Sequence, residues 1–289
     1  MRRFKRSFWL GIACAIALAP PCARAEDGID TEHIFAFVIG TDVGNLGERE
    51  FQSETTGRFG KGGGTYRAFG QQVEIEVVPL PNFRIEVGAT AALHDITGVP
   101  DIDDRRQFNF QGISLDLRYR LLDRESAPFG LTIAAESHGD RIDEISGAKG
   151  RSYGTDLTLA VDRELVPNFA IGAINLIYQP EWARLEVTGL SDKSSTIGVG
   201  FAGMVRMRPD ILFGGEMRYF RQYDGIGLGD FAGQALFIGP TAYFQLSERS
   251  RLTVAWSMQA WGRPAGSSAN LDLVNFERHQ ARLVFGVNF

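Results

Sequence analysis

The chain has 289 residues, a formal net charge of −5 at pH 7 and a mean hydropathy of −0.10, and 44% of its side chains are hydrophobic. This hydrophobic content excludes a disordered chain, which has too few apolar residues to form a core. The mean hydropathy excludes a bundle of transmembrane helices, because each such helix needs about 20 apolar residues. The averages alone therefore resemble those of a soluble protein.

The first 25 residues have the three parts of a secretory signal peptide. Four cations lie within residues 1–6, an apolar run covers residues 8–19, and the small-residue site Ala23-Arg24-Ala25 follows. Together these parts predict export and cleavage after Ala25. The apolar run is too short for a spanning helix, which needs about 20 residues. We therefore expect a signal peptide over residues 1–25 and a mature domain over 26–289.

Cleavage would change the chemistry of the remaining chain. Both cysteines, Cys14 and Cys22, precede the site, so the mature chain would hold no thiol and no disulfide. Five cations and no acid would be lost, and the net charge would fall from −5 to −10. An acidic exported chain lacks the basic face that nucleic-acid binding requires, so that class of function is excluded.

The mature chain alternates apolar and polar residues with a period of two. Residues 113–121 place Ile, Leu and Tyr at odd positions and polar residues between them, and residues 73–77 and 252–260 follow the same pattern. This period predicts β-strands with two chemically different faces. No apolar run approaches the length of a transmembrane helix.

About twelve such segments occur, and many have ten or more residues. Strands of soluble proteins usually have about 5–6 residues, whereas a tilted strand that spans a bilayer needs about 9–11. The lengths therefore favour a membrane barrel. The predicted strands lie near residues 33–43, 65–78, 83–94, 107–121, 129–139, 151–163, 169–181, 195–207, 211–222, 235–246, 251–262 and 278–289.

Short turns alternate with long loops along this series. Pro with Asn or Asp recurs at compact turns such as 79–82, 166–168 and 208–210, while polar, Gly-rich connections lie between them. Outer-membrane barrels have short periplasmic turns and long external loops. The repeat of about 40 residues also resembles a β-propeller. However, each repeat here holds two long strands instead of four short ones. The long connections lie at 44–64, 95–106, 140–150, 182–194, 223–234 and 263–277.

The last predicted strand places Leu283, Phe285, Val287 and Phe289 on one face. A final strand of this kind that ends in Phe resembles the signal read by the bacterial barrel-assembly machinery. Together with the signal peptide and the turn–loop alternation, it predicts an all-β fold: a closed up-and-down antiparallel transmembrane barrel of about twelve strands in the bacterial outer membrane. An even strand number places both termini and the short turns in the periplasm.

Five short runs resemble those of a family of uncharacterised proteobacterial outer-membrane β-barrel proteins that are porin-like in general style. The resemblance covers the mature chain and implies an outer-membrane location without assigning an activity. The runs are TTGRFGK (55–61), RLLDRE (120–125), APFGL (127–131), PEW (180–182) and NFERHQAR (275–282).

The function then depends on the lumen. With the apolar set of each strand facing lipid, charged side chains face inward and could line a narrow passive channel for small hydrophilic solutes. The alternative is a plugged structural or adhesion barrel, closed by pairs of Arg and carboxylate. The predicted pore-lining residues are Glu74, Glu76, Arg84, Glu86, Asp116, Arg118, Arg120, Glu136, Asp156, Glu216, Arg218 and Arg282, and Asp162 and Arg206 share their face.

An outer-membrane lipid hydrolase is a third hypothesis, and it would need a serine beside a histidine. His94 and His138 are expected to point inward, whereas Ser137 points to lipid, so an enzyme is not favoured. The acids Asp101, Asp103 and Asp104 are expected to form a solvated loop, not a calcium site. No metal and no cofactor are expected. The expected partners are outer-membrane lipids, lipopolysaccharide and the barrel-assembly machinery, and the oligomeric state stays open.

Overall fold

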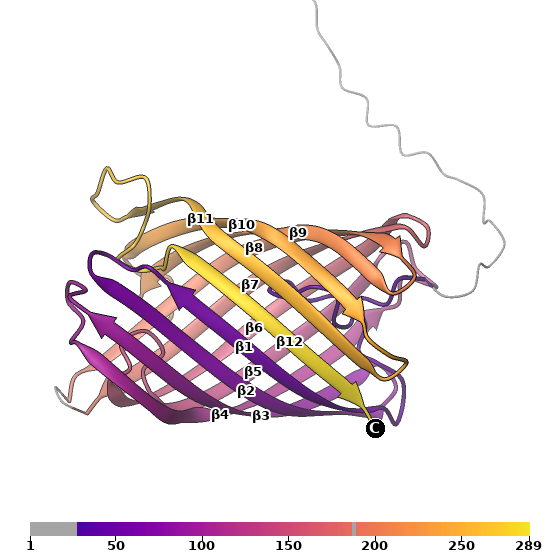
Figure 1. Cartoon of the computed structure of the whole chain (residues 1–289), viewed down its shortest axis with the longest axis horizontal. Helices are drawn as coiled ribbons and strands as arrows, with labels where there is room; N and C mark the ends of the chain where they lie inside the picture. Colours follow the sequence, from indigo (N-terminus) through magenta and orange to yellow (C-terminus); the bar gives the residue numbers. More distant parts are fainter. Residues whose placement is uncertain (1–27, 187–188) are drawn as a thin grey trace, which may run out of the picture.

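A computed structural model describes residues 28–186 and 189–289, and the expected signal peptide over residues 1–25 lies outside the described residues. Within these ranges twelve β-strands follow one another (Figure 1). Among the described residues no helix is long and apolar enough to cross a membrane. The strands are β1 (Arg49–Phe59), β2 (Thr65–Leu80), β3 (Phe83–Thr97), β4 (Arg105–Leu122), β5 (Gly130–Ile142), β6 (Lys149–Val166), β7 (Ala170–Leu185), β8 (Ser191–Arg208), β9 (Ile211–Asp224), β10 (Phe231–Gln245), β11 (Ser250–Pro264) and β12 (His279–Asn288).

The strands form a closed antiparallel barrel in which each strand pairs with its neighbours in sequence. β1 pairs with β12 and closes the sheet, with Glu50 opposite Asn288 and Thr55 opposite Leu283. Closure leaves no unpaired edge, which is the condition for a sheet to lie in a bilayer. The fold prediction of a closed up-and-down barrel is confirmed.

The two ends of the barrel differ in their connections. We call the end that holds the start of β1 and the end of β12 the turn end, which is marked C in Figure 1, and the opposite end the loop end. Asn82 and Asn168 adopt positive φ angles of 63° and 58° in the turns that follow β2 and β6. Asparagine tolerates this left-handed conformation better than most residues. The expected turns at 79–82 and 166–168 are therefore confirmed.

The prediction of a strand at 33–43 is wrong. These residues form no strand, and the first strand is β1, Arg49–Phe59, within a stretch expected to be an external loop. The apolar run over 34–39 is continuous and does not alternate, because it packs inside the barrel instead of facing lipid on one side. β1 escaped detection because Ser53 and Thr55 on its outward face are polar and bind Gln71 of β2.

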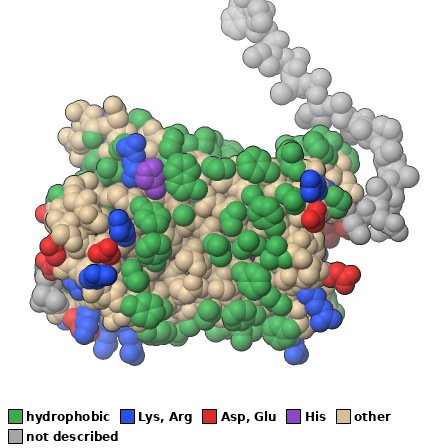
Figure 2. All heavy atoms as spheres, viewed as in Figure 1, with side chains coloured by type: hydrophobic (Ala, Val, Ile, Leu, Met, Phe, Trp, Pro, Cys, Tyr) green, Lys and Arg blue, Asp and Glu red, His purple; other side chains and the backbone are tan. Residues whose placement is uncertain are grey.

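The wall has an apolar outer face and a polar inner face. Ile75 is 54% exposed on the outside, while its neighbour Glu74 is 7% exposed and points inward. Figure 2 shows hydrophobic side chains across the middle of the wall, with charged side chains gathered toward the two ends. This is the pattern of a barrel whose outer face contacts lipid. At β12, Leu283 and Phe289 are exposed and Val284 is buried, so the predicted alternation of this strand is present.

Candidate functional site

Residues 28–48 precede β1 at the turn end, and we call them the luminal segment; residues 29–43 lie inside the barrel and are mostly buried, whereas residues 45–47 are exposed (Figure 1). Its middle part, residues 34–39, forms no strand, and side chains of the wall bind its backbone. Glu216 of β9 accepts hydrogen bonds from the N–H groups of Ala36, Phe37 and Val38 at 2.7–2.8 Å. Asn175 of β7 accepts another from Ile39 at 2.8 Å. The polar wall therefore holds the segment in a defined conformation.

Apolar side chains anchor the segment to β7, β8 and β9. Ile34, Phe35 and Val38 form one buried cluster with inward residues of these strands, including Ile171 and Met204. Apolar residues on the inner face of this sector are unusual for a polar lumen, and their presence is explained by the segment that covers them. Each fully buried side chain of this size contributes about 1.5–3 kcal/mol.

Ionic contacts fix the segment to the turn between β4 and β5. Asp42 pairs with Arg124 and, at 3.3 Å, with Arg120. Asp162 of β6 accepts hydrogen bonds from the Thr31 hydroxyl at 2.6 Å and the Thr41 N–H at 2.8 Å. Burial would raise the pKa of Asp42, but the Arg124 guanidinium beside it holds that pKa below its usual value of 3.8. Asp42 is therefore charged at neutral pH.

The tip of the segment meets two arginines. The guanidinium carbon of Arg218 lies 3.8 Å from the centre of the Phe37 ring, and that of Arg282 lies 4.7 Å from it. Arg282 also donates a hydrogen bond to the Ala36 carbonyl at 2.9 Å. The tip thus covers the cationic side of the lumen.

Three carboxylates line the lumen beyond the tip. Glu74 binds Gln52 and Gln72 at 2.7 Å, Glu136 binds Gln72 at 3.4 Å, and Asp156 binds Gln179 at 2.7 Å. Among the residues described here, none of these three has an ion-pair partner, and we call them the acidic wall. Asp156 lies on β6, which is separated from the Arg282 strand β12 by five strands on either side. Asp156 and Arg282 therefore lie on opposite sides of the lumen.

Other charges pair closely near the turn end. Arg84 contacts Glu76 at 3.4 Å and also pairs with Glu86, and Arg118 pairs with Asp116 at 2.6 Å. All twelve residues expected to line a pore have side chains on the inner side, where three form the acidic wall and the others contact the luminal segment or one another. Their assignment to a pore stays a prediction. The lumen combines unpaired acids at mid-height with closed Arg–carboxylate pairs below.

Loops narrow the lumen at the loop end. Arg58 of β1 pairs with Glu144 of the β5–β6 loop at 2.5 Å and with Glu277 of the β11–β12 loop at 3.5 Å. Phe276 inserts against Phe237, with ring centres 6.3 Å apart. Arg58 and the luminal segment were both missed by the sequence analysis. Both had been placed in the wrong element because β1 was not recognised.

The histidines do not form a serine–histidine pair in the described part of the chain. Ser137 points outward and bonds to Thr155 at 3.1 Å, whereas His138 points inward and bonds to Asp140 at 2.9 Å. Ser114 lies opposite His138 on β4, but its hydroxyl accepts a hydrogen bond from Gln72 instead. His94 bonds to the Glu144 carbonyl at 2.9 Å. Nucleophilic catalysis needs a serine within hydrogen-bond reach of its base.

The acids at 101–104 do not converge on one point. Asp104 accepts a hydrogen bond from the Gly98 N–H at 2.7 Å, while the Asp103 side chain is 93% exposed. The solvated loop that was expected is the arrangement observed. In the residues that the structure describes, the cluster with metal-binding geometry lies elsewhere, at Glu32, His33 and Glu76.

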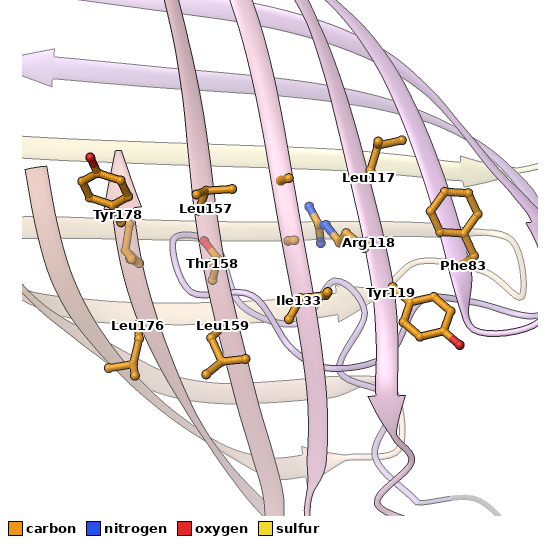
Figure 3. Close-up of a pocket in the computed structure, with 13 residues that line it drawn as sticks. Phe83, Leu117, Arg118, Tyr119, Ile133, Leu157, Thr158, Leu159, Leu176 and Tyr178 are labelled. Atoms are coloured by element: carbon orange, nitrogen blue, oxygen red, sulfur yellow. The ribbon is translucent and has the colours of Figure 1, made fainter. Parts of the chain in front are cut away.

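A hollow of about 570 Å³ lies on the outer wall (Figure 3). Leu117, Ile133, Leu157 and Leu176 surround it, and Ala135 also lines it. Four of these side chains belong to the exposed apolar face. Its position and apolar lining suit a lipid acyl chain, so we do not assign it to the lumen.

Comparisons with known proteins agree with this architecture. The family described as "Family of unknown function (DUF6662)" matches residues 27–289, and no curated protein matches the chain. The COG4313 outer membrane channel from Pseudomonas putida F1 aligns with a TM-score of 0.59 at 11% identity, over 86% of this chain and 98% of that chain. The translocator domain of autotransporter NalP from Neisseria meningitidis aligns with a TM-score of 0.49 at 16% identity, over 86% and 91% of the two chains. The first likeness shows an outer-membrane barrel fold, and the expected resemblance to an uncharacterised family of such barrels is confirmed.

Proposed function

We propose that this chain, which belongs to the DUF6662 family of unknown function, forms a narrow outer-membrane channel for small hydrophilic solutes that the luminal segment closes. The observation that carries the proposal is the acidic wall. Glu74, Glu136 and Asp156 have amide partners and no cation. Carboxylates without cations are costly away from water, so this part of the lumen is built to be hydrated.

The apolar outer face and the closed sheet support an outer-membrane location, with the turn end in the periplasm. A barrel of twelve strands encloses more space than one of eight, whose interior is nearly filled by side chains, and much less than a porin of 16–18 strands. This size favours single ions and small polar solutes. The acidic wall has three carboxylates, whereas the luminal segment covers two arginines, Arg218 and Arg282. The open channel therefore prefers cations.

The closed state of this channel is the one described. Residues 34–39 occupy the turn-end half of the lumen through Glu216, Asn175 and the apolar cluster. Conduction then requires the luminal segment to move out, since the strands themselves need no rearrangement. The channel is passive because solute movement depends only on the gradient and on the position of the segment.

A reversible crosslink tests this proposal. A Cβ placed on Gly200 would lie 3.0 Å from Val38 Cγ2. In Val38→Cys the sulfur would take about the place of this methyl carbon, and in a disulfide each sulfur lies ~3 Å from the Cβ of the other cysteine. The double variant Val38→Cys/Gly200→Cys therefore ties the segment to β8. In planar bilayers we expect discrete conductance steps from the reduced protein and none from the oxidised protein. The single variant Val38→Cys controls for the reductant.

The runner-up is a structural barrel sealed by the same segment. The apolar cluster around Ile34 and Phe35 favours this alternative, because it makes docking strong. The two differ in the protein that keeps the segment, because a structural barrel would conduct only after deletion of residues 28–47, whereas a channel also opens with the segment present and free. If the deletion variant folds, as judged by heat-modifiable mobility, and still conducts nothing, the lumen is sealed without the segment and the channel proposal is wrong. The opposite faces of Ser137 and His138 leave the hydrolase hypothesis without support.

A further inference from the structure

His33 of the luminal segment is surrounded by three carboxylates. Its Nε2 lies 3.7 Å from Glu32 Oε2, 3.7 Å from Glu50 Oε2 on β1 and 3.6 Å from Glu76 Oε2 on β2. This nitrogen is buried and has no hydrogen-bond partner, and neither has Glu50 Oε1. Glu50 and Glu76 are each only 2% exposed. A buried polar atom without a partner is costly, so this arrangement calls for a further ligand.

Acidic groups predominate around His33. Five carboxyl groups and three guanidinium groups meet here, so acidic side chains outnumber cationic ones. A bound divalent cation would offset this excess. The carboxylates belong to Glu32, Glu50, Glu76, Glu86 and Asp116, and the guanidinium groups belong to Arg84, Arg118 and Arg251.

We propose that His33, Glu32 and Glu76 bind a divalent transition-metal ion of the Zn²⁺ class between the luminal segment and the barrel wall. Ligand atoms of these three residues lie within 4.8 Å of one another. A tetrahedral Zn²⁺ with bonds of 2.0–2.1 Å separates its ligand atoms by roughly 3.4 Å. The observed separations of 3.6 and 3.7 Å from His33 Nε2 exceed this value by only a few tenths of an ångström.

The donor set selects the class of metal. One imidazole nitrogen with carboxylate oxygens suits Zn²⁺ and its neighbours, whereas Mg²⁺ and Ca²⁺ prefer oxygen alone. The His33 Nε2 is buried without a hydrogen-bond partner, so it could bind a metal ion without losing an existing hydrogen bond. Glu50 or a water molecule would complete the fourth position.

Arg84 orients the Glu32 carboxylate. It contacts Glu32 through Oε1 at 2.9 Å, which leaves Oε2 directed toward His33. Outer partners of this kind raise the affinity of metal sites. A cavity of about 200 Å³, lined by Glu32, His33 and Glu50, reaches the turn between β10 and β11 and offers a path for the ion.

The ion would connect the luminal segment to the barrel wall, and these two parts separate if the segment leaves the lumen. Glu32 and His33 belong to the luminal segment, while Glu76 belongs to β2. Metal binding would thus hold the segment in the lumen. This consequence rests on the proposed channel function, whereas metal binding itself does not.

Metal binding is measured on the whole exported protein in detergent after dialysis against a chelator. We expect one Zn²⁺ per chain by calorimetry, and the visible absorption of tetrahedral Co²⁺ when Co²⁺ replaces it. His33→Ala and Glu76→Gln should each weaken binding by about 100-fold, since even outer-shell changes cost 10–100-fold. His138→Ala is the matched control, because it removes the other luminal histidine that contacts a carboxylate.

Equal Zn²⁺ affinity in the His33→Ala variant and the unaltered protein would overturn the proposal, as would loss of binding in the His138→Ala variant alone. Heat-modifiable mobility shows whether each variant is folded. If His33→Ala does not fold, His33→Gln replaces it in the binding measurement. Conductance with and without a chelator then tests the consequence separately. Binding that leaves conductance unchanged keeps the metal site and removes its role in closing the channel.

Discussion

The guanidinium of Arg218 stacks on the ring of Phe37, 3.8 Å from its centre, and so joins the wall of the barrel to the tip of the luminal segment. Arg282 lies on the same ring, 4.7 Å from its centre. A docked segment therefore masks the two cations and leaves Glu74, Glu136 and Asp156 uncovered.

Replacing Phe37 with Ala removes both cation–π contacts. Each contributes about 0.5–2 kcal/mol, so we expect the open fraction to rise by about tenfold. Single-channel recording measures this fraction directly. Phe129→Ala, which removes an exposed ring at the turn end, should leave it unchanged. An open fraction that does not differ between the two variants would contradict the proposed contact.

Glu216→Gln weakens the hydrogen bonds to three consecutive N–H groups of the segment. Bonds to a charged acceptor contribute about 1.5–3 kcal/mol each, and the neutral amide offers one acceptor in place of two. Hydrogen exchange at residues 36–38 should accelerate by at least about tenfold. Exchange within β5 provides an internal reference. Unchanged protection at 36–38 would show that Glu216 does not hold the segment.

Acid should release the segment through Asp42. Its pKa is lower in the docked state than the usual 3.8, so the stabilisation from Arg124 is complete above about pH 4 and disappears as the pH falls through the lowered pKa. We expect conductance to increase below pH 4. At pH 7 the conductance of the Asp42→Asn variant should resemble that of the unaltered protein below pH 4. A variant that stays closed at both pH values would argue against this contact.

Selectivity should follow the acidic wall. With the crosslinked variant reduced, Glu136→Gln removes one uncompensated charge and should shift the reversal potential in a salt gradient toward anions. Asp101→Asn changes the net charge by the same amount at the loop end, where Asp101 is exposed. We expect a clearly smaller shift from that control. Equal shifts would mean that overall charge, not the acidic wall, sets the preference.

The mature protein should begin at Glu26. Intact mass spectrometry of protein purified from outer membranes gives this boundary directly, and no thiol should react because Cys14 and Cys22 precede it. A mass that includes residues 1–25 would disprove cleavage after Ala25.

Periodicity predicted eleven of the twelve strands in the described residues because lipid imposes an apolar outer face on them. β1 was missed because its outer face is partly polar. Ser53 and Thr55 lie on that face, and both form hydrogen bonds with Gln71 of β2. The inward charges of β2 to β6 could be read from the same alternation. Their partners could not, because contacts such as Asp42 with Arg124 join residues 82 positions apart in an irregular segment. Such pairing depends on the three-dimensional packing alone.

Both ends of the luminal segment lie at the turn end. Ile29 donates its N–H to Glu164 of β6, and Gly47 donates its N–H to the Val78 carbonyl of β2. The segment is thus a loop inserted through one mouth, not a thread passed along the barrel. During assembly, β1 and β12 can pair before this loop enters the lumen. This topology allows barrel closure and filling of its interior to be separate folding steps, so the order in which the chain is translocated need not match the order in which it packs.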